Sequence, residues 1–208
     1  MDDPFAGKRR RMTEEQLRAR GIADEAVLRA MARVPRERFV AEGLRGSAYV
    51  DGPLPIGRGQ TISQPYIVAY MTERLELSGR EAVLEIGTGS GYQAAVLAET
   101  ASRVYTVERI PELSAGARAL LEGELGYRNV FYKVGRGQEG WAEFAPFERI
   151  VLTAAPEEFP APLFRQLAEG GIALAPLGAG GQSLVRFRKR EGRIDAEELI
   201  GVVFVPLV

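Results

Sequence analysis

Short apolar runs alternate with segments of helical periodicity along the C-terminal part of the chain. In the intervening segments, apolar positions recur every three or four residues. The runs that predict strands are 82–86, 103–107, 130–134, 149–153, 171–175, 182–189 and 194–200. Helices are predicted at 91–99, 111–125 and 161–168. Strands that alternate with helices predict a mainly parallel sheet with helices on both faces.

The end of the chain departs from this alternation. The last two strand runs are joined by a turn at Glu191-Gly192 with no helix between them, which predicts an antiparallel hairpin at one edge of the sheet. The apolar segment 202–205 closes the chain. We therefore predict an α/β fold with a doubly wound, Rossmann-like sheet that is mainly parallel and has an antiparallel C-terminal edge.

The N-terminal part has a different pattern. Helices are predicted to begin at Thr13 and to cover 24–34 and 65–75, and residues 36–63 are rich in glycine and proline. An ordered loop region of that length is usually functional. Residues 1–12, with the basic run Lys8–Arg11, are expected to form a loose charged tail. We predict one domain over 1–208, with an N-terminal helical and loop extension at 1–63 and a ligand-binding core at 64–208.

Composition narrows the chemistry. The 208 residues include no cysteine and no histidine. This excludes disulfides, thiolate nucleophiles, imidazole bases and ordinary zinc sites, and we expect no metal. Catalysis in such a chain must use carboxylates, hydroxyls, backbone groups, arginine or lysine, or a bound cofactor.

Charge and hydropathy bear on location and partners. The net charge is −1, and no apolar run reaches the ~20 residues of a membrane span. The basic run Lys8–Arg11 leads into polar residues, unlike a secretory signal. Arg186, Arg188 and Arg190 alternate with other residues, and we favour a solvated edge hairpin over a nucleic-acid stripe. We expect a cytoplasmic monomer without nucleic-acid or membrane partners.

A glycine-rich loop is the sharpest local motif. Gly87-Thr-Gly-Ser-Gly91 lies between a predicted strand and a predicted helix. Glycine there allows a ligand to approach the backbone. The sixth position is Tyr92, where a dinucleotide loop has glycine, and the Gly-Lys-Ser/Thr end of a phosphate loop is missing. The flanks of Ser90 do not match a nucleophile elbow.

Two acidic residues accompany this loop. Glu85 precedes it, and Glu108 ends the next strand, where a carboxylate can accept from both hydroxyls of a ribose. A nucleoside with a cationic tail suits these charges, which predicts S-adenosyl-L-methionine as cofactor. The alternative is that the glycines only form a tight turn between strand and helix.

A longer block gives a more specific indication. Residues 53–69, with Gln60-Thr-Ile-Ser63 at their centre, resemble the signature of the protein-L-isoaspartate O-methyltransferases. Further matches to that family lie at 34–40, 140–141, 145–147, 152–155, 170–171, 181–182 and 204–207. The resemblance extends over about residues 14–207. It implies the methyltransferase form of the doubly wound sheet. It also implies methyl transfer from S-adenosyl-L-methionine to the free carboxylate of L-isoaspartyl residues in damaged proteins and peptides.

The resemblance also implies residue roles. Ser63 is expected to carry the active-site hydroxyl, and Glu108 to hold the ribose. The expected cofactor-binding set is Gln60, Thr61, Ile62, Ser63, Glu85, Gly87, Thr88, Gly89, Ser90, Gly91, Glu108, Arg109, Arg136 and Gly137. Of these, Glu85 and the glycine loop are expected to face the methionine portion. From the residues alone, a helix N-cap ahead of Pro65 is favoured for Ser63; the family match favours catalysis.

The chain departs from the family pattern at two positions. The family has an acid between two glycines after the third strand, where it accepts from the adenine amino group, and this chain has Arg136, which offers no acceptor. Val203 stands where the family often has arginine. Two alternatives therefore stay open: a methyltransferase of the same fold with another acceptor, and a non-catalytic S-adenosyl-L-methionine-binding module.

Overall fold

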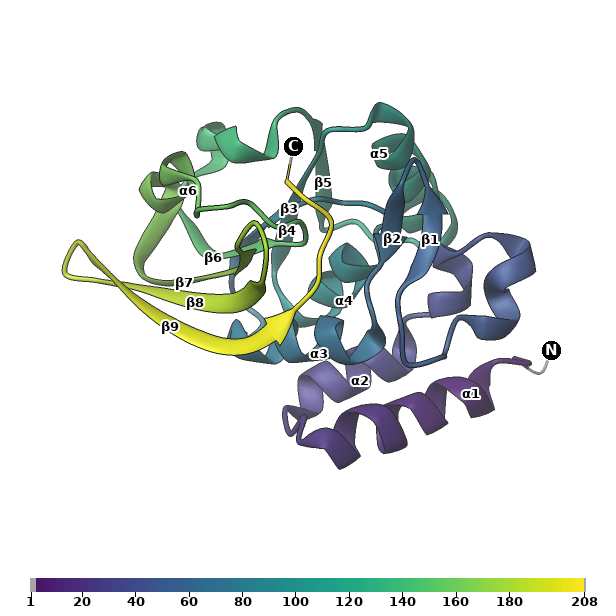
Figure 1. Ribbon diagram of the computed structural model, residues 1–208. Helices are drawn as coiled ribbons and strands as arrows, with labels where there is room; N and C mark the ends of the chain where they lie inside the picture. Colours follow the sequence, from purple (N-terminus) through teal and green to yellow (C-terminus); the bar gives the residue numbers. More distant parts are fainter. Residues whose placement is uncertain (1–2, 208) are drawn as a thin grey trace.

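A seven-stranded sheet forms the centre of the computed structural model, which describes residues 3–207 (Figure 1). The strands are β3 (Ala82–Ile86), β4 (Arg103–Glu108), β5 (Val130–Val134), β6 (Phe147–Leu152), β7 (Leu167–Leu177), β8 (Gln182–Arg190) and β9 (Arg193–Val202). Their order is β5-β4-β3-β6-β7-β8-β9. The first five in that order are parallel, and β8 and β9 are antiparallel. The predicted α/β sheet with an antiparallel C-terminal edge is confirmed.

Both faces of the sheet are covered. The helices are α1 (Ala6–Arg11), α2 (Glu25–Arg33), α3 (Pro65–Arg74), α4 (Tyr92–Thr100), α5 (Pro111–Arg118) and α6 (Ala161–Gln166). On one face, Val83 and Val104 join a core with the N-terminal helices, α3 and α4. On the other face, Leu84 and Tyr105 belong to a second core with Leu163 of α6. Strands buried on both faces explain why the runs read as continuously apolar.

Some predicted bounds differ from the observed ones. The helix predicted at 161–168 ends at Gln166, because the chain enters β7 at Leu167. The register of β6 and β7 shifts between Phe147 and Arg149, and Gly170 in β7 has a φ of +73°. An irregular strand start of this kind breaks the period-two pattern. The helix predicted at 111–125 continues beyond α5 as a π-helical segment, Ala119–Glu124.

The N-terminal tail prediction is wrong. Helix α1 begins at Ala6 and continues into a π-helical segment, Met12–Leu17. The Arg9 side chain is only 12% exposed; it donates to the Tyr49 hydroxyl at 2.9 Å and to Glu37 at 3.2 Å. An arginine can bury its aliphatic stem while its guanidinium is paired, so a basic run is not always a solvated tail.

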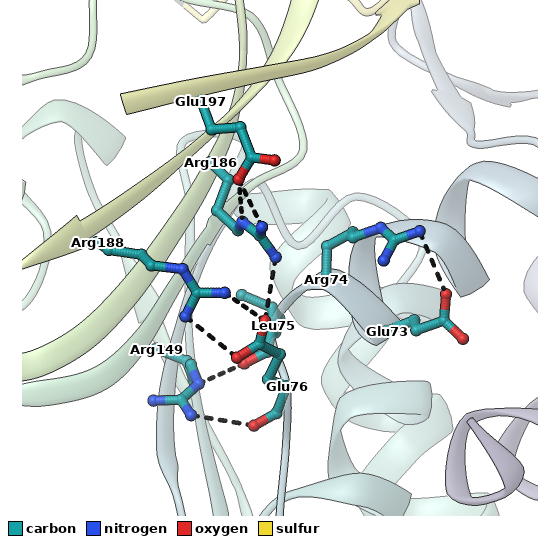
Figure 2. Close-up of polar contacts among 8 residues, drawn as sticks. All are labelled: Glu73, Arg74, Leu75, Glu76, Arg149, Arg186, Arg188 and Glu197. Atoms are coloured by element: carbon teal, nitrogen blue, oxygen red, sulfur yellow. Dashed lines mark hydrogen bonds and ion pairs between the residues drawn. The ribbon is translucent and has the colours of Figure 1, made fainter. Parts of the chain in front are cut away.

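Arg186 and Arg188 of β8 are paired rather than solvated, whereas Arg190 at the end of the strand is exposed. Strand β8 lies inside the sheet, between β7 and the edge strand β9. Figure 2 shows Arg186 and Arg188 converging on the carboxylate of Glu76, with Arg186 also bound to Glu197. Arg149 donates to the backbone carbonyl of Glu76 at 3.0 Å. These ion pairs join the sheet to the segment after α3, which corrects the expectation of solvated side chains for Arg186 and Arg188.

A second, two-stranded sheet stands beside the large one. Strands β1 (Leu54–Gly57) and β2 (Gln60–Ile62) are antiparallel, and both turn residues, Arg58 and Gly59, have positive φ, as in a two-residue type I′ turn. Figure 1 shows this hairpin near the C-terminal segment, which crosses the end of the large sheet. The sequence predicted only a loop-rich region here.

The C-terminal segment is extended but mostly unpaired. Only Val202 of the apolar run 202–205 belongs to β9. The Ala155 amide donates to the carbonyl of Val205, and the Leu207 amide donates to the carbonyl of Ala155, both at 2.8 Å. This pairing holds the segment against the end of β6. No helix in residues 3–207 has the length and apolar character needed to cross a membrane.

Candidate functional site

The glycine loop lies at the carboxyl end of β3, where the strand order reverses between β4 and β6. Ligands of open α/β sheets bind at such a switch point. Gly87 has a φ of +98°, and a Cβ there would lie 2.4 Å from the Thr153 hydroxyl oxygen. That hydroxyl donates to the carbonyl of Gly87 at 2.6 Å. The close contact between the loop and the end of β6 therefore requires glycine.

The loop lines a cleft that we call the inner cleft. Its empty space, counted out to the open mouth, is about 840 Å³. The predicted site residues that line it are Gln60, Thr61, Ile62, Ser63, Gly87, Thr88, Gly89, Ser90, Glu108, Arg109 and Gly137. The structure thus brings the Gln60–Ser63 block and the glycine loop, which are far apart in sequence, to one cavity.

Glu108 is fixed by the backbone around it. One carboxylate oxygen accepts from the Gly89 amide and the other from the Ile110 amide, both at 2.9 Å. The side chain is buried but lines the inner cleft. Each oxygen retains a lone pair for a further donor. This carboxylate is therefore oriented before any ligand arrives.

Glu85 does not reach the inner cleft, contrary to the expected contact with a ligand. It is 0% exposed in the middle of β3, and it accepts a hydrogen bond from the Thr106 hydroxyl at 2.5 Å. Its other oxygen has no partner among residues 3–207. Burial raises the pKa of Glu85 from 4.5 to about 8; the bond from Thr106 opposes this shift, and the charge of Glu108 adds to it. The carboxyl is mainly neutral at pH 7.

Two other predicted residues also lie outside the cleft lining. Gly91, with a φ of +86°, packs against the helix after β4: a Cβ there would lie 3.1 Å from the side chains of Ala117 and Leu121. The Arg136 side chain is 74% exposed, and its nearest ion-pair partner is Glu139, at 3.9 Å. The glycine is needed for packing, and the arginine is exposed to solvent and does not line the cavity.

A second cleft, the outer cleft, adjoins the first. Its empty space, counted in the same way, is about 1380 Å³. Its walls come from the hairpin region, the loop before β8 and the C-terminal segment: Pro53, Thr61, Ser63, Gln64, Ile67, Thr153, Gly180, Gly181, Gln182, Gly201, Val202, Val203, Phe204 and Val205. None of these side chains is ionisable, although 26% of the chain is charged.

Four residues line both clefts and form what we call the shared wall: Thr61, Ser63, Thr153 and Val205. Three of them carry hydroxyl groups. Ser63 is not the N-cap of α3, since that position is Gln64, which makes no side-chain capping bond. The N-cap interpretation of Ser63 is therefore wrong, and its hydroxyl is not committed to the helix.

Sequence reasoning missed several members of these clefts. Thr153 follows β6, and in a parallel sheet the residue after such a strand lies at the same edge as the glycine loop. That rule could have identified it. Val205, Pro206 and Leu207 lie in the family match at 204–207, but nothing in the sequence placed them at the cleft, because their position depends on the pairing with Ala155. Within residues 3–207 no three acidic side chains gather as a metal site would require.

Comparison with known proteins agrees with this geometry. The family model for protein-L-isoaspartate (D-aspartate) O-methyltransferase matches residues 8–208. The chain belongs to this family. It is 54% identical over 205 residues to a protein-L-isoaspartate O-methyltransferase of Picosynechococcus sp., a match that covers 99% of this chain and 92% of that one.

Solved structures of the protein-L-isoaspartate O-methyltransferase family share the fold. One aligns with a TM-score of 0.88 and 29% identity over 95% of this chain, which spans 65% of that longer chain. A Plasmodium falciparum structure with the same family name, in complex with S-adenosyl-L-homocysteine, aligns with a TM-score of 0.83 and 26% identity. That alignment covers 96% of this chain and 98% of the other.

One departure from the protein-L-isoaspartate O-methyltransferase pattern affects the outer cleft directly. Val203 is 95% exposed and lines this cleft at the position where the family often has arginine. Within residues 3–207, the lining of the outer cleft thus has no charged side chain even at Val203, a position that could have carried a cation.

Proposed function

We propose that this chain transfers a methyl group from S-adenosyl-L-methionine to the free carboxylate of L-isoaspartyl residues in damaged proteins and peptides. The observation that carries the proposal is the shared wall. Thr61, Ser63 and Thr153 separate a cleft built around the glycine loop and Glu108 from an open cleft without ionisable lining residues. Such a wall lets two ligands meet at one point.

The inner cleft suits the cofactor. The free lone pairs on the fixed Glu108 carboxylate match the two hydroxyls of a ribose. The backbone of Gly87–Ser90 would hold the methionine portion. Gly137, which lines this cleft and packs too tightly against Ile86 to carry a Cβ, would lie against the adenine. When bound, S-adenosyl-L-methionine supplies an activated methyl group.

The outer cleft suits a peptide carboxylate. A carboxylate is already ionised at pH 7, so the acceptor needs no base, which agrees with a chain that has no histidine. The hydroxyls of Thr61 and Ser63 in the shared wall can donate to one carboxylate oxygen and orient the other, whereas the Thr153 hydroxyl already donates to the carbonyl of Gly87. A cation in direct contact would stabilise the bound substrate more than the transition state. The neutral lining therefore favours transfer.

We also propose that the chain acts as a single domain and a monomer in the cytoplasm, without nucleic-acid partners. The net charge of −1 and the pairing of Arg186 and Arg188 with glutamates support the absence of nucleic-acid partners, because two of the three alternating arginines of β8 are neutralised.

A labelled methyl donor tests the function. The acceptors are a synthetic peptide with one L-isoaspartyl residue and its normal aspartyl twin. We expect base-labile label in the first peptide only, since a methyl ester hydrolyses in base. Transfer to neither peptide by protein that still binds the cofactor would contradict the proposal and favour a non-catalytic binding module.

Ser63→Ala tests the catalytic assignment. The variant should lower kcat by roughly tenfold to a hundredfold, because one oriented hydroxyl is lost at the transfer point. The fold should persist, since the Ser63 side chain caps no helix. Ser102→Ala, an exposed serine at the amino end of β4, is the control and should keep full turnover. Full turnover in Ser63→Ala would remove the catalytic assignment.

A further inference from the structure

Arg36 is a fully buried arginine without a carboxylate partner. It lies in the 3₁₀ turn Arg36–Phe39 after α2, and its exposure is 0%. Within residues 3–207 no acidic side chain lies within ion-pair distance of it. The neighbouring Glu37 is instead bound by Arg9 and Tyr49. A buried charge without a counter-charge is costly, so its retention indicates a role.

The contacts of Arg36 are all to neutral groups. Its Nε donates to the carbonyl of Ala48 and its Nη2 to the carbonyl of Ser63, both at 2.7 Å. The guanidinium lies 4.7 Å from the ring centroid of Tyr92. The Nη1 atom is buried and has no hydrogen-bond partner among residues 3–207. The positive charge is therefore fixed in place but not neutralised.

The position of this charge relates it to both clefts. Ser63 belongs to the shared wall, and Tyr92 lines the inner cleft. From the bond between Arg36 and the Ser63 carbonyl, covalent geometry places the Ser63 hydroxyl within about 7 Å of the guanidinium. Arg36 itself lines neither cleft. The wall thus has a cation behind it that no ligand can touch.

We propose that Arg36 is a positioning residue that also gives the transfer point a positive potential. By holding the Ser63 carbonyl it places the Ser63 hydroxyl. Its charge attracts the acceptor carboxylate into the outer cleft, whose lining is neutral. The same charge weakens the binding of the sulfonium form of the cofactor, S-adenosyl-L-methionine, more than the binding of the neutral thioether product, S-adenosyl-L-homocysteine. The inference rests on the proposed methyl transfer to a carboxylate.

The burial of Arg36 explains why this arrangement suits the reaction. A guanidinium keeps its proton even when burial lowers its pKa, so the charge is permanent. In the protein interior a charge acts over several ångströms with little screening. Because the wall prevents direct contact, the carboxylate is drawn in without forming an ion pair that would have to break during transfer.

Two substitutions separate charge from hydrogen bonding. Arg36→Gln keeps an amide donor but removes the charge, and Arg36→Lys keeps the charge but not the fork of donors. Arg149→Gln is the control, since Arg149 also donates to backbone carbonyls, at Leu75 and Glu76, but belongs to the paired cluster of Figure 2. Thermal unfolding checks that each variant is folded.

The decisive readout is calorimetry of S-adenosyl-L-methionine and S-adenosyl-L-homocysteine. In Arg36→Gln we expect S-adenosyl-L-methionine to gain roughly threefold to tenfold in affinity relative to S-adenosyl-L-homocysteine. The KM for an isoaspartyl peptide should rise roughly tenfold. Arg149→Gln should keep the wild-type affinity ratio, and so should Arg36→Lys at a pH at which its lysine is protonated. An unchanged ratio in folded Arg36→Gln, or a ratio in Arg36→Lys that equals that of Arg36→Gln at every pH, would overturn the proposal.

A second measurement covers the case in which Arg36→Gln does not fold. A lysine at this buried position should lose its proton at an accessible pH. As pH rises, the affinity of Arg36→Lys for S-adenosyl-L-methionine relative to S-adenosyl-L-homocysteine should then increase, while the same ratio measured in wild type should not increase in parallel. If the ratios of the variant and of wild type differed by the same factor at every pH, the inference would be contradicted. Both calorimetric readouts measure cofactor binding alone, so their failure is distinguishable from failure of the methylation assay.

Discussion

Glu85 shows how a single side chain can join the sheet to the site without touching a ligand. Its carboxyl is bound to the Thr106 hydroxyl, which lies 2.6 Å from the hydroxyl of Thr88. Thr88 lines the inner cleft. A neutral Glu85 can donate into this chain of hydroxyls, whereas an ionised one can only accept. The protonation state of Glu85 thus influences which way the Thr88 hydroxyl points.

The raised pKa of Glu85 predicts a pH dependence of stability. In the unfolded chain the carboxyl ionises near pH 4.5, and in the folded protein near pH 8. Between these values the folded state retains a proton that the unfolded state has released, so the free energy of unfolding falls as pH rises. In Glu85→Gln this pH-dependent contribution to the free energy of unfolding is absent, because glutamine does not ionise.

We therefore expect the stability of Glu85→Gln relative to wild type to increase by about 1 kcal/mol per pH unit between about pH 5 and pH 8. Urea unfolding of both proteins across that range measures the difference. If the free energies of unfolding of the variant and of wild type changed with pH in parallel, Glu85 would not carry the raised pKa.

Arg136 gives the second prediction at the residue scale. Among residues 3–207 its side chain has one ion-pair partner, Glu139, at 3.9 Å, and Gly137 beside it lines the inner cleft. By the family pattern, a carboxylate at 136 would accept from the adenine amino group. Arg136→Asp should tighten S-adenosyl-L-methionine binding about fivefold, the effect of one hydrogen bond of about 1 kcal/mol.

The control for Arg136→Asp is Arg103→Asp, which makes the same charge change at the amino end of β4. Calorimetry of both variants is the measurement. Unchanged or weaker binding by Arg136→Asp, or equal tightening by the two variants, would rule out an adenine contact at this position.

At the scale of elements, the N-terminal helix is part of the core and not an appendage. Arg9 of α1 donates to the Tyr49 hydroxyl and to Glu37, which lies in the same turn as Arg36. Met12 and Leu17, in the segment that continues α1, are fully buried. The helix therefore supports the turn that holds the carbonyl of Ser63.

Arg9→Ala should lower the free energy of unfolding by about 2–3 kcal/mol, because it leaves the buried Glu37 without its cation. Arg11→Ala removes an exposed arginine from the same helix and should cost less than about 0.5 kcal/mol. Chemical denaturation compares the two variants. Equal losses would mean that the basic run is only a solvated face.

The strands and the glycine loop could be predicted from sequence, because local periodicity and turn residues determine them. The β1–β2 hairpin could not, since two strands of three and four residues have too few positions to show a period. Nor could the burial of Arg9 or Glu85, which depends on partners distant in sequence. Contacts between residues distant in sequence cannot be inferred from local periodicity.

At the scale of the whole molecule, the topology of the sheet and the path of the C-terminal segment create two clefts with one wall. The switch between β4 and β6 places the inner cleft, and the segment after β9 closes the outer one. The sequence motifs placed the Gln60–Ser63 block and the glycine loop in one predicted site, and both line the inner cleft. The sequence could not predict the outer cleft, because the segments that line it are distant in sequence and meet only in the fold.

The central claim is that the shared wall presents a free carboxylate to a methyl donor. The most direct measurement compares kcat/KM for three peptides of one sequence. They contain an L-isoaspartyl residue, a normal aspartyl residue, or an L-isoaspartyl residue whose α-carboxyl is an amide. We predict methyl transfer to the first peptide and at least roughly hundredfold less to the other two. Comparable transfer to the amide or to the aspartyl peptide would contradict the account.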